Sequence, residues 1–281
     1  MVLPTVIFLL VFQYYPAISG LYRSLFDWNA GLEGRFIGLA NFVELFTDDK
    51  VFILSLKNMA LLTSWYLITG VGFSILVAVA IHRIRNGQMK YTFRLFMILP
   101  VAIPSVVHIL LWVFIYDATI GPLNELLEAV GLQSWTHAWL AETKIAIYAV
   151  MFRNFPWIDG VAVLILLAGF QVIPVEIVES GLLDGATGWR RLWYIELPLV
   201  TGQIRLLMVL TIMWSVQEFT SIFAMTQGGP LDSTQVPGMW MYFNAFRIGR
   251  MGYASAMGVV MFVITFVATI INMHYIKIQE S

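Results

Sequence analysis

The residues best suited to chemistry are polar side chains that interrupt long apolar segments. Arg153, Asn154 and Trp157 lie in one such segment, where i, i+3 and i+4 spacing would put them on one face of a helix. A second set at i, i+3, i+4 and i+7 in another segment comprises Trp214, Gln217, Glu218 and Ser221. Amides and carboxylates hydrogen-bond hydroxyl groups, and an indole packs on the apolar face of a sugar ring. The two sets therefore indicate a path for a polyhydroxylated solute, and the alternative is that they join helices by hydrogen bonds.

The elements that would position these residues are membrane-spanning helices. Of the 281 residues 59% are hydrophobic and 12% are charged, and the mean hydropathy is +0.81. An ordinary soluble domain is about 25% charged, so the composition predicts an integral membrane protein. The net charge of −1 gives no sign of a nucleic-acid partner, and the absence of cysteine excludes a disulfide framework and thiol catalysis.

Six apolar segments approach the ~20 residues needed to cross ~30 Å of hydrocarbon. We expect one all-α transmembrane domain over residues 1–281. The expected spans are residues 2–22, 59–81, 95–116, 144–168, 206–225 and 253–275. Pro100 and Pro104 predict a kink near the start of the third span.

Between the fourth and fifth spans, residues 171–203 form the longest amphipathic loop. Pro174 suits a helix start, Asp184-Gly185 is a turn, and Thr187 suits the cap of a second helix that closes at Pro198. The apolar side predicted for that second helix comprises Trp189, Leu192, Trp193 and Ile195. Such a pair cannot bury itself alone, so it should lie against a membrane surface, a neighbouring loop or a partner protein.

The order of residues in this loop resembles a known motif. Five residues separate Glu179 from Gly185, and nine more separate Gly185 from Ile195-x-Leu197-Pro198. This spacing is similar to the EAA loop of ABC-importer permeases. Asp184-Gly185-Ala186 resembles the sugar-importing branch, with the maltose and glycerol-phosphate permeases as the nearest likeness. In that family the loop docks into a groove on the cytoplasmic ATPase. The resemblance therefore implies an ATPase contact made by Glu179, Ser180, Gly181, Asp184, Gly185, Ala186, Ile195, Leu197 and Pro198.

The loop departs from the family at Ser180 and Gly181, which replace the two alanines of the motif. A glycine inside a helix costs up to about 1 kcal/mol relative to alanine. The substitution therefore predicts a less rigid docking helix.

Further stretches resemble the same family in the same order, so the likeness touches nearly the whole chain. They include residues 36–42, Thr226-x-Gly228-Gly229-Pro230 and residues 252–256. The resemblance places Gly228, Gly229 and Pro230 near the surface offered to an external solute-binding protein. It also implies a second homologous permease, two ATPase subunits that hold ATP and Mg²⁺, and a sugar substrate.

Basic residues give the expected orientation. Four of them, Arg83, Arg85, Lys90 and Arg94, concentrate in a short loop, and short loops are what the positive-inside rule weighs. Together with the family likeness, they predict that this loop, the 171–203 loop and both termini are cytoplasmic in a bacterial-type cytoplasmic membrane.

The chain carries no Gly-x-x-x-x-Gly-Lys-Ser/Thr loop, so we expect no nucleotide hydrolysis by this polypeptide. Its four histidines are scattered, and no metal site or cofactor is expected. An alternative is a secondary transporter coupled to H⁺ or Na⁺ that titrates Glu218 or Asp159. A third class is a membrane scaffold or sensor without substrate flux. The residues leave open which sugar or sugar phosphate is carried.

Overall fold

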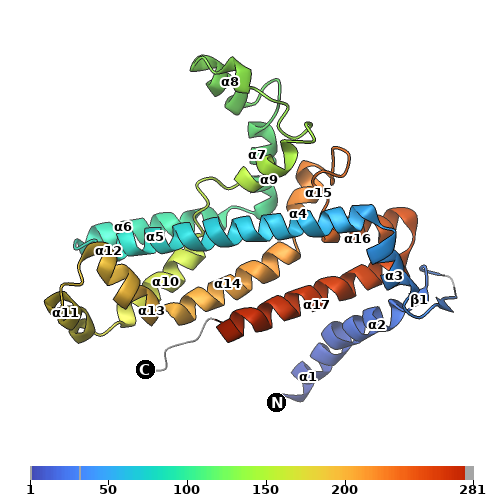
Figure 1. Ribbon diagram of the computed structural model, residues 1–281, viewed down its shortest axis with the longest axis horizontal. Coiled ribbons are helices and arrows are strands. Elements are labelled where there is room, and N and C mark those ends of the chain that lie inside the picture. Colours follow the sequence, from blue (N-terminus) through green and yellow to red (C-terminus); the bar gives the residue numbers. More distant parts are fainter. Residues whose placement is uncertain (1, 32, 276–281) are drawn as a thin grey trace. The chain divides into compact units, whose positions relative to one another are not determined.

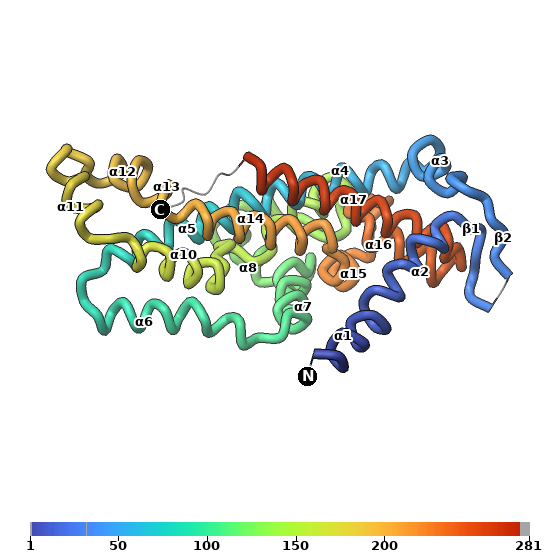
Figure 2. Tube along the Cα trace, turned by 90° about the horizontal axis from the view of Figure 1, so that it is seen from below, coloured from blue at the N-terminus to red at the C-terminus, as the bar shows by residue number. Residues whose placement is uncertain are grey.

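The computed structural model describes residues 2–31 and 33–275, and helices make up almost all of its regular structure (Figures 1 and 2). The all-α prediction is therefore confirmed. In the described residues the β-structure is one short antiparallel pair, β1 (Phe26–Asp27) with β2 (Arg35–Phe36), in which Phe26 lies opposite Phe36. Met1, Leu32 and residues 276–281, which include the expected cytoplasmic C-terminus, lie outside the described residues.

Three described helices are long and apolar enough to cross a membrane: Leu3–Arg23, Lys50–His82 and Met251–Tyr275. Three further pairs of helices pass the same test together, although each pair is bent by more than 40°. These pairs are Gly87–Ala102 with Ser105–Ile115, Gly160–Val172 with Val175–Leu183, and Gly188–Leu199 with Thr201–Val216. The described chain thus has three spans by length and composition, or up to six if each bent pair is one span, and the count of six stays a prediction.

The third expected span bends by 87° at its prolines, so the predicted kink is confirmed. Helix α6 (Gly87–Ile98) and a 3₁₀ turn (Leu99–Ala102) come before the bend, and α7 (Ser105–Ile115) follows it. Ile103 is extended (ψ 124°), as expected for a residue that precedes a proline, here Pro104.

The fourth expected span, residues 144–168, is wrong as one continuous helix. Helix α9 (Ala146–Phe152) ends early, residues 153–159 form turns and extended chain, and α10 (Gly160–Val172) then begins. Pro156 cannot continue a helix, and Oδ1 of Asp159 caps α10 by accepting from the backbone N–H of Val161 (2.8 Å) and Ala162 (3.2 Å). The helical spacing assumed for Arg153, Asn154 and Trp157 is therefore not realised.

The fifth expected span is also interrupted. Helix α14 (Thr201–Val216) ends before Gln217, and α15 (Thr220–Met225) starts after Phe219. Oε1 of Glu218 accepts from the backbone N–H of Ser221 at 3.1 Å, so a polar side chain competes for the backbone at the break. The single helical stripe predicted over residues 214–221 is therefore wrong.

The chain divides into two compact units. The first comprises Met1–Leu61, Phe114–Val150 and Val216–Phe266. Its further helices are α1 (Leu3–Leu9), α2 (Tyr15–Arg23) after the π-helical turn Leu10–Tyr14, α3 (Ala40–Thr47), α8 (Pro122–Ala129), α16 (Pro237–Tyr242) with the π-helical turn Phe243–Ile248, and the beginnings of α4 (Lys50–Tyr66) and α17 (Met251–Tyr275). A 3₁₀ turn, Gln133–Trp135, also belongs to it. Its core joins Leu45, Phe52, Tyr253, Ala256 and Met257.

The second unit comprises Leu62–Val113, Met151–Ser215 and Val267–Ser281. The π-helical turn Leu67–Val71 links α4 to α5 (Gly72–His82), which packs on α10 through Ala78, Leu166, Leu167 and Phe170. Gly160 makes a close approach possible, since a Cβ there would lie 1.8 Å from the backbone oxygen of Met97 on α6. At one end of this unit lies the loop that follows α10 (Figures 1 and 2).

Candidate functional site

The amphipathic loop folds as a two-armed hairpin, residues 174–199, which we call the hairpin. Its first arm is α11 (Val175–Leu183), which begins directly after Pro174 as predicted. Gly185 has a left-handed backbone (φ 80°), and the N–H groups of Ala186 and Gly185 donate to the carbonyls of Gly181 (2.8 Å) and Leu182 (3.1 Å). This pair of bonds is a Schellman motif. The predicted turn at Asp184-Gly185 is therefore confirmed.

The second arm consists of α12 (Gly188–Arg191), the π-helical turn Leu192–Glu196 and α13 (Leu197–Leu199). Thr187 occupies the cap position, but its side chain makes no capping hydrogen bond within the described chain, so that detail of the prediction is wrong. Its carbonyl instead accepts from the backbone N–H of Arg190 at 3.0 Å. Helical structure continues through Pro198 to Leu199, and α14 then leaves at a bend of 73°.

The two arms touch at a glycine. A Cβ on Gly181 would lie 2.1 Å from Cδ1 of Ile195 on the opposite arm. Gly181, which replaces an alanine of the motif, thus lets the two arms approach closely. This tighter packing offsets the helix-propensity cost expected of a glycine inside a helix.

The outer side of the hairpin is open. Helix α11, all of whose residues are described, has no buried residue. Of the predicted contact residues, Glu179, Ser180, Asp184 and Gly185 are exposed, whereas Gly181, Ala186, Ile195, Leu197 and Pro198 are half-buried. The exposed group therefore gathers on the first arm and the turn.

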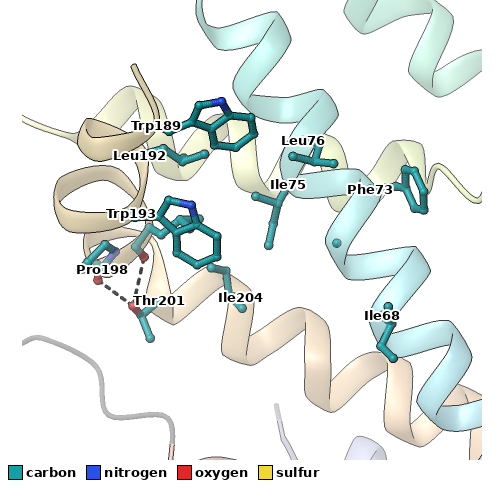
Figure 3. A pocket seen from close by; sticks show the side chains of 12 residues that line it. Ile68, Phe73, Ile75, Leu76, Trp189, Leu192, Trp193, Pro198, Thr201 and Ile204 are labelled. Carbon is teal, nitrogen blue, oxygen red and sulfur yellow. Dashed lines mark hydrogen bonds between the residues drawn. The ribbon is translucent and has the colours of Figure 1, made fainter. Parts of the chain in front are cut away.

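The predicted apolar side of the second arm is divided between two environments. Leu192 is buried in the core of the unit, whereas the side chains of Trp189 and Trp193 are largely exposed. Figure 3 shows both indoles pointing from the hairpin toward α5. They line an apolar groove of about 690 Å³, whose other lining residues are Ile68, Gly72, Phe73, Ile75, Leu76, Leu192, Leu197, Pro198, Thr201 and Ile204.

A buried carboxylate lies at the base of the hairpin. Glu196 is 1% exposed and accepts from Nε of Arg191 at 2.7 Å and from Nη2 of Arg83 at 3.3 Å. Motif reasoning missed Glu196 because it occupies the variable position of Ile195-x-Leu197. The signal that could have found it is a carboxylate within an otherwise apolar stretch that follows two arginines.

The predicted pathway residues of the fourth segment lie at its helix break. Trp157 joins an aromatic cluster with Trp65, Phe73, Phe152 and Phe155. The indole N–H groups of Trp65 (2.7 Å) and Trp157 (3.2 Å) both donate to the carbonyl of Met151. Arg153 is buried whereas Asn154 is exposed, so the structure does not bring the predicted trio onto one face.

The second predicted set is likewise dispersed. Trp214 is exposed near the end of α14, Gln217 is exposed in the break, and Ser221 is buried on α15. Glu218 uses a carboxylate oxygen to cap α15. The four residues therefore share neither one helix nor one environment.

The Gly228-Gly229-Pro230 segment forms a tightly held turn. Gly228 has φ 87°, and the hydroxyl of Thr234 donates to the carbonyl of Gly229 at 2.8 Å. The side-chain amide of Asn58 on α4 donates to the carbonyls of Ser233 (3.0 Å) and Gln235 (2.9 Å). This turn is therefore anchored to a long helix, which fixes its position within the first unit.

Residues 70–277 match the family described as the binding-protein-dependent transport system inner membrane component. The chain belongs to this family. It is a membrane component of ABC importers, a transport component and not an enzyme.

Similar proteins match nearly the whole chain. The chain is 33% identical over 275 residues to the probable ABC transporter permease protein YurN of Bacillus subtilis, covering 98% of this chain and 94% of that one. It is 30% identical to the diacetylchitobiose uptake system permease protein NgcF of Streptomyces coelicolor, over 94% of this chain and 77% of that one. A solved chain from a bacterial alginate ABC transporter, in complex with alginate pentasaccharide-bound periplasmic protein, superposes with a TM-score of 0.81 at 25% identity, covering 98% of this chain and 91% of that one.

Proposed function

We propose that this importer permease carries a sugar and forms half of the translocation path beside a second, homologous permease. Two similar proteins support the substrate class: one is named for diacetylchitobiose uptake, and the other belongs to an alginate transporter. Release of the sugar from an external binding protein would start each cycle, as the periplasmic protein in the alginate complex suggests.

In this proposal the hairpin of residues 174–199 receives the mechanical input from two cytoplasmic ATPase subunits, which bind ATP and Mg²⁺. We therefore call it the coupling hairpin from here on. The observation that carries the proposal is that α11 has a well-defined end at Gly185 and packs against the second arm, yet none of its residues is buried. An ordered amphipathic arm with an open outer side fits a protein groove. Glu179, Ser180, Asp184 and Gly185 would make the contact, and both termini would then be cytoplasmic.

Substrate would pass the helix breaks of the fourth and fifth segments. Non-helical backbone at membrane depth is tolerated where it is covered by protein or lines a water-filled cavity. Trp157 would stack on a sugar ring with its N–H already used by Met151, while Arg153, Asn154, Trp214, Gln217, Glu218 and Ser221 would supply polar groups along the path. The turn at Gly228, Gly229 and Pro230 would face the binding protein.

The test is uptake by the purified complex in lipid vesicles, with the partner permease, the ATPase and the binding protein encoded beside it. Uptake should require internal ATP and the binding protein. Uptake that persists without ATP and collapses with an ion gradient would overturn the proposal.

The assigned contact is tested by Glu179→Lys, which reverses a charge on the exposed arm. Binding-protein-stimulated ATPase activity should fall while the complex still assembles. Glu176→Lys is the matched control, because Glu176 is an exposed glutamate in the first turn of the same helix. Equal stimulation in the wild type and Glu179→Lys would contradict the contact.

A further inference from the structure

The coupling hairpin is joined to its own spanning segments through two sharp bends. Between α10 and α11 the bend is 75°, and between the second arm and α14 it is 73°. Force transmitted through such bends alone would be partly absorbed by changes in their angles. A connection from the hairpin to a third segment, one without a break of this kind, would remove that freedom.

The structure contains such a connection. Arg83 is the C-cap residue of α5, at the end of the long Lys50–His82 segment. Its Nη2 donates both to the carboxylate of Glu196, at 3.3 Å, and to the carbonyl of Gly188, at 3.1 Å. One guanidinium of α5 thus holds two points of the second arm, at the start of α12 and at the end of the π-helical turn.

Burial makes this connection specific. The Glu196 side chain is 2% exposed, against 23% for Arg191 and 39% for Arg83. A buried carboxylate must keep its partners, since an unpaired charge in this position is strongly unfavourable. Arg191 lies within the hairpin and satisfies one oxygen, while Arg83 satisfies the other from α5. The two arginines therefore have separable roles: one stabilises the arm and the other attaches it.

We propose that Glu196 and Arg83 are positioning residues that lock the coupling hairpin to α5, so that displacement of the hairpin moves the Lys50–His82 segment with it. The inference rests on the proposed coupling function and adds the route by which the motion enters the helices. Loss of the Arg83 attachment leaves a hairpin that still docks but transmits less of its motion.

The activity test uses the full complex in lipid vesicles and compares sugar taken up per ATP hydrolysed. Arg83→Gln should lower this ratio about tenfold, within the range typical of coupling between sites. Arg83→Lys retains the charge and should recover part of it. Arg85→Gln, two residues later in the same loop, is the control and should leave the ratio unchanged. A role in stability alone would lower the yield of complex and leave the ratio as it is, which would overturn the proposal.

A second measurement does not depend on activity. The chain has no cysteine, so spin labels at Glu176→Cys and Arg85→Cys report one distance, from the first arm to the loop after α5. In the assembled complex Arg83→Gln should broaden the distribution of this distance, whereas Arg191→Gln should broaden it less. An unchanged distribution in Arg83→Gln overturns the lock. If the wild-type complex shows no ATP-driven uptake, the proposed function fails, and the distance measurement still decides whether Arg83 holds the hairpin.

Discussion

The contact between Gly181 and Ile195 gives a prediction whose magnitude follows from the structure. Gly181→Ala should gain about 1 kcal/mol of helix propensity in α11. It would also place a Cβ 2.1 Å from Cδ1 of Ile195, where ordinary contact starts at 3.4 Å, so Cδ1 must move by 1.3 Å, the difference of these two distances. Such overpacking typically costs about 1–3 kcal/mol. The single substitution should therefore leave the hairpin equally stable or up to about 2 kcal/mol less stable.

The companion change Ile195→Val removes the atom that clashes. In that background the alanine at position 181 keeps its propensity gain, and opening of α11 should become about fivefold rarer for a gain of about 1 kcal/mol. The cost of Ile195→Val itself is the same whether position 181 is glycine or alanine, apart from the interaction being measured, so it cancels in the double-mutant cycle. The predicted interaction free energy is thus about 1–3 kcal/mol.

Hydrogen exchange of the α11 amides in the assembled complex measures this quantity, because it reports local opening and not global unfolding. Four proteins are compared: wild type, each single variant and the double variant. Independent sites add to within about 0.5 kcal/mol. An interaction free energy below that limit would refute the view that Gly181 is there to admit Ile195.

Three further predictions concern other contacts. Asp49 accepts from the Trp240 indole and the Tyr253 hydroxyl, both at 2.7 Å, so Asp49→Ala should destabilise the first unit by about 3–5 kcal/mol. Glu44→Ala removes an ion pair with Arg250 in which both side chains are 40% exposed, and it should cost about 1 kcal/mol or less although the pair is shorter. Equal shifts of the thermal midpoint in the two variants would contradict this order. Gly185→Ala places a Cβ in a left-handed backbone and should destabilise the hairpin by about 1–2 kcal/mol, whereas Gly185→Asn should cost less. Hydrogen exchange of the α11 amides measures both effects. Identical exchange in the two variants would contradict the role assigned to the left-handed backbone at the turn. Backbone N–H donation from Thr119 and Ile120 lowers the pKa of Asp117. Its contribution to the turn is therefore complete above the unfolded pKa and is lost as pH falls through the lower folded pKa. Hydrogen exchange of those two amides measures this contribution, and protection that is unchanged below this range, or in Asp117→Ala, would show that the carboxylate does not hold the turn.

Local signals in the sequence were sufficient for part of the hairpin. Pro174 begins α11 and Gly185 ends it, because the fixed φ of proline and the tolerance of glycine for a left-handed backbone are properties of those residues in any protein. The breaks at 153–159 and 217–219 were missed although Pro156, Asp159 and Glu218 mark them. The spans were predicted from the hydrophobicity of each segment. A side chain that caps a helix changes this hydrophobicity little, so the breaks left no signal in it.

The sequence by itself determined that this is an all-helical membrane chain, since apolar composition decides the preferred solvent of a helix whatever its neighbours are. It also determined the family, because the spacing of the loop motif is a property of one stretch. Only the tertiary structure decided that Gly181 meets Ile195 and that Arg83 reaches Glu196, 113 residues further along the chain. Such contacts depend on how separate helices pack against one another. The periodicity within a single segment cannot predict which residue of another segment will lie beside it.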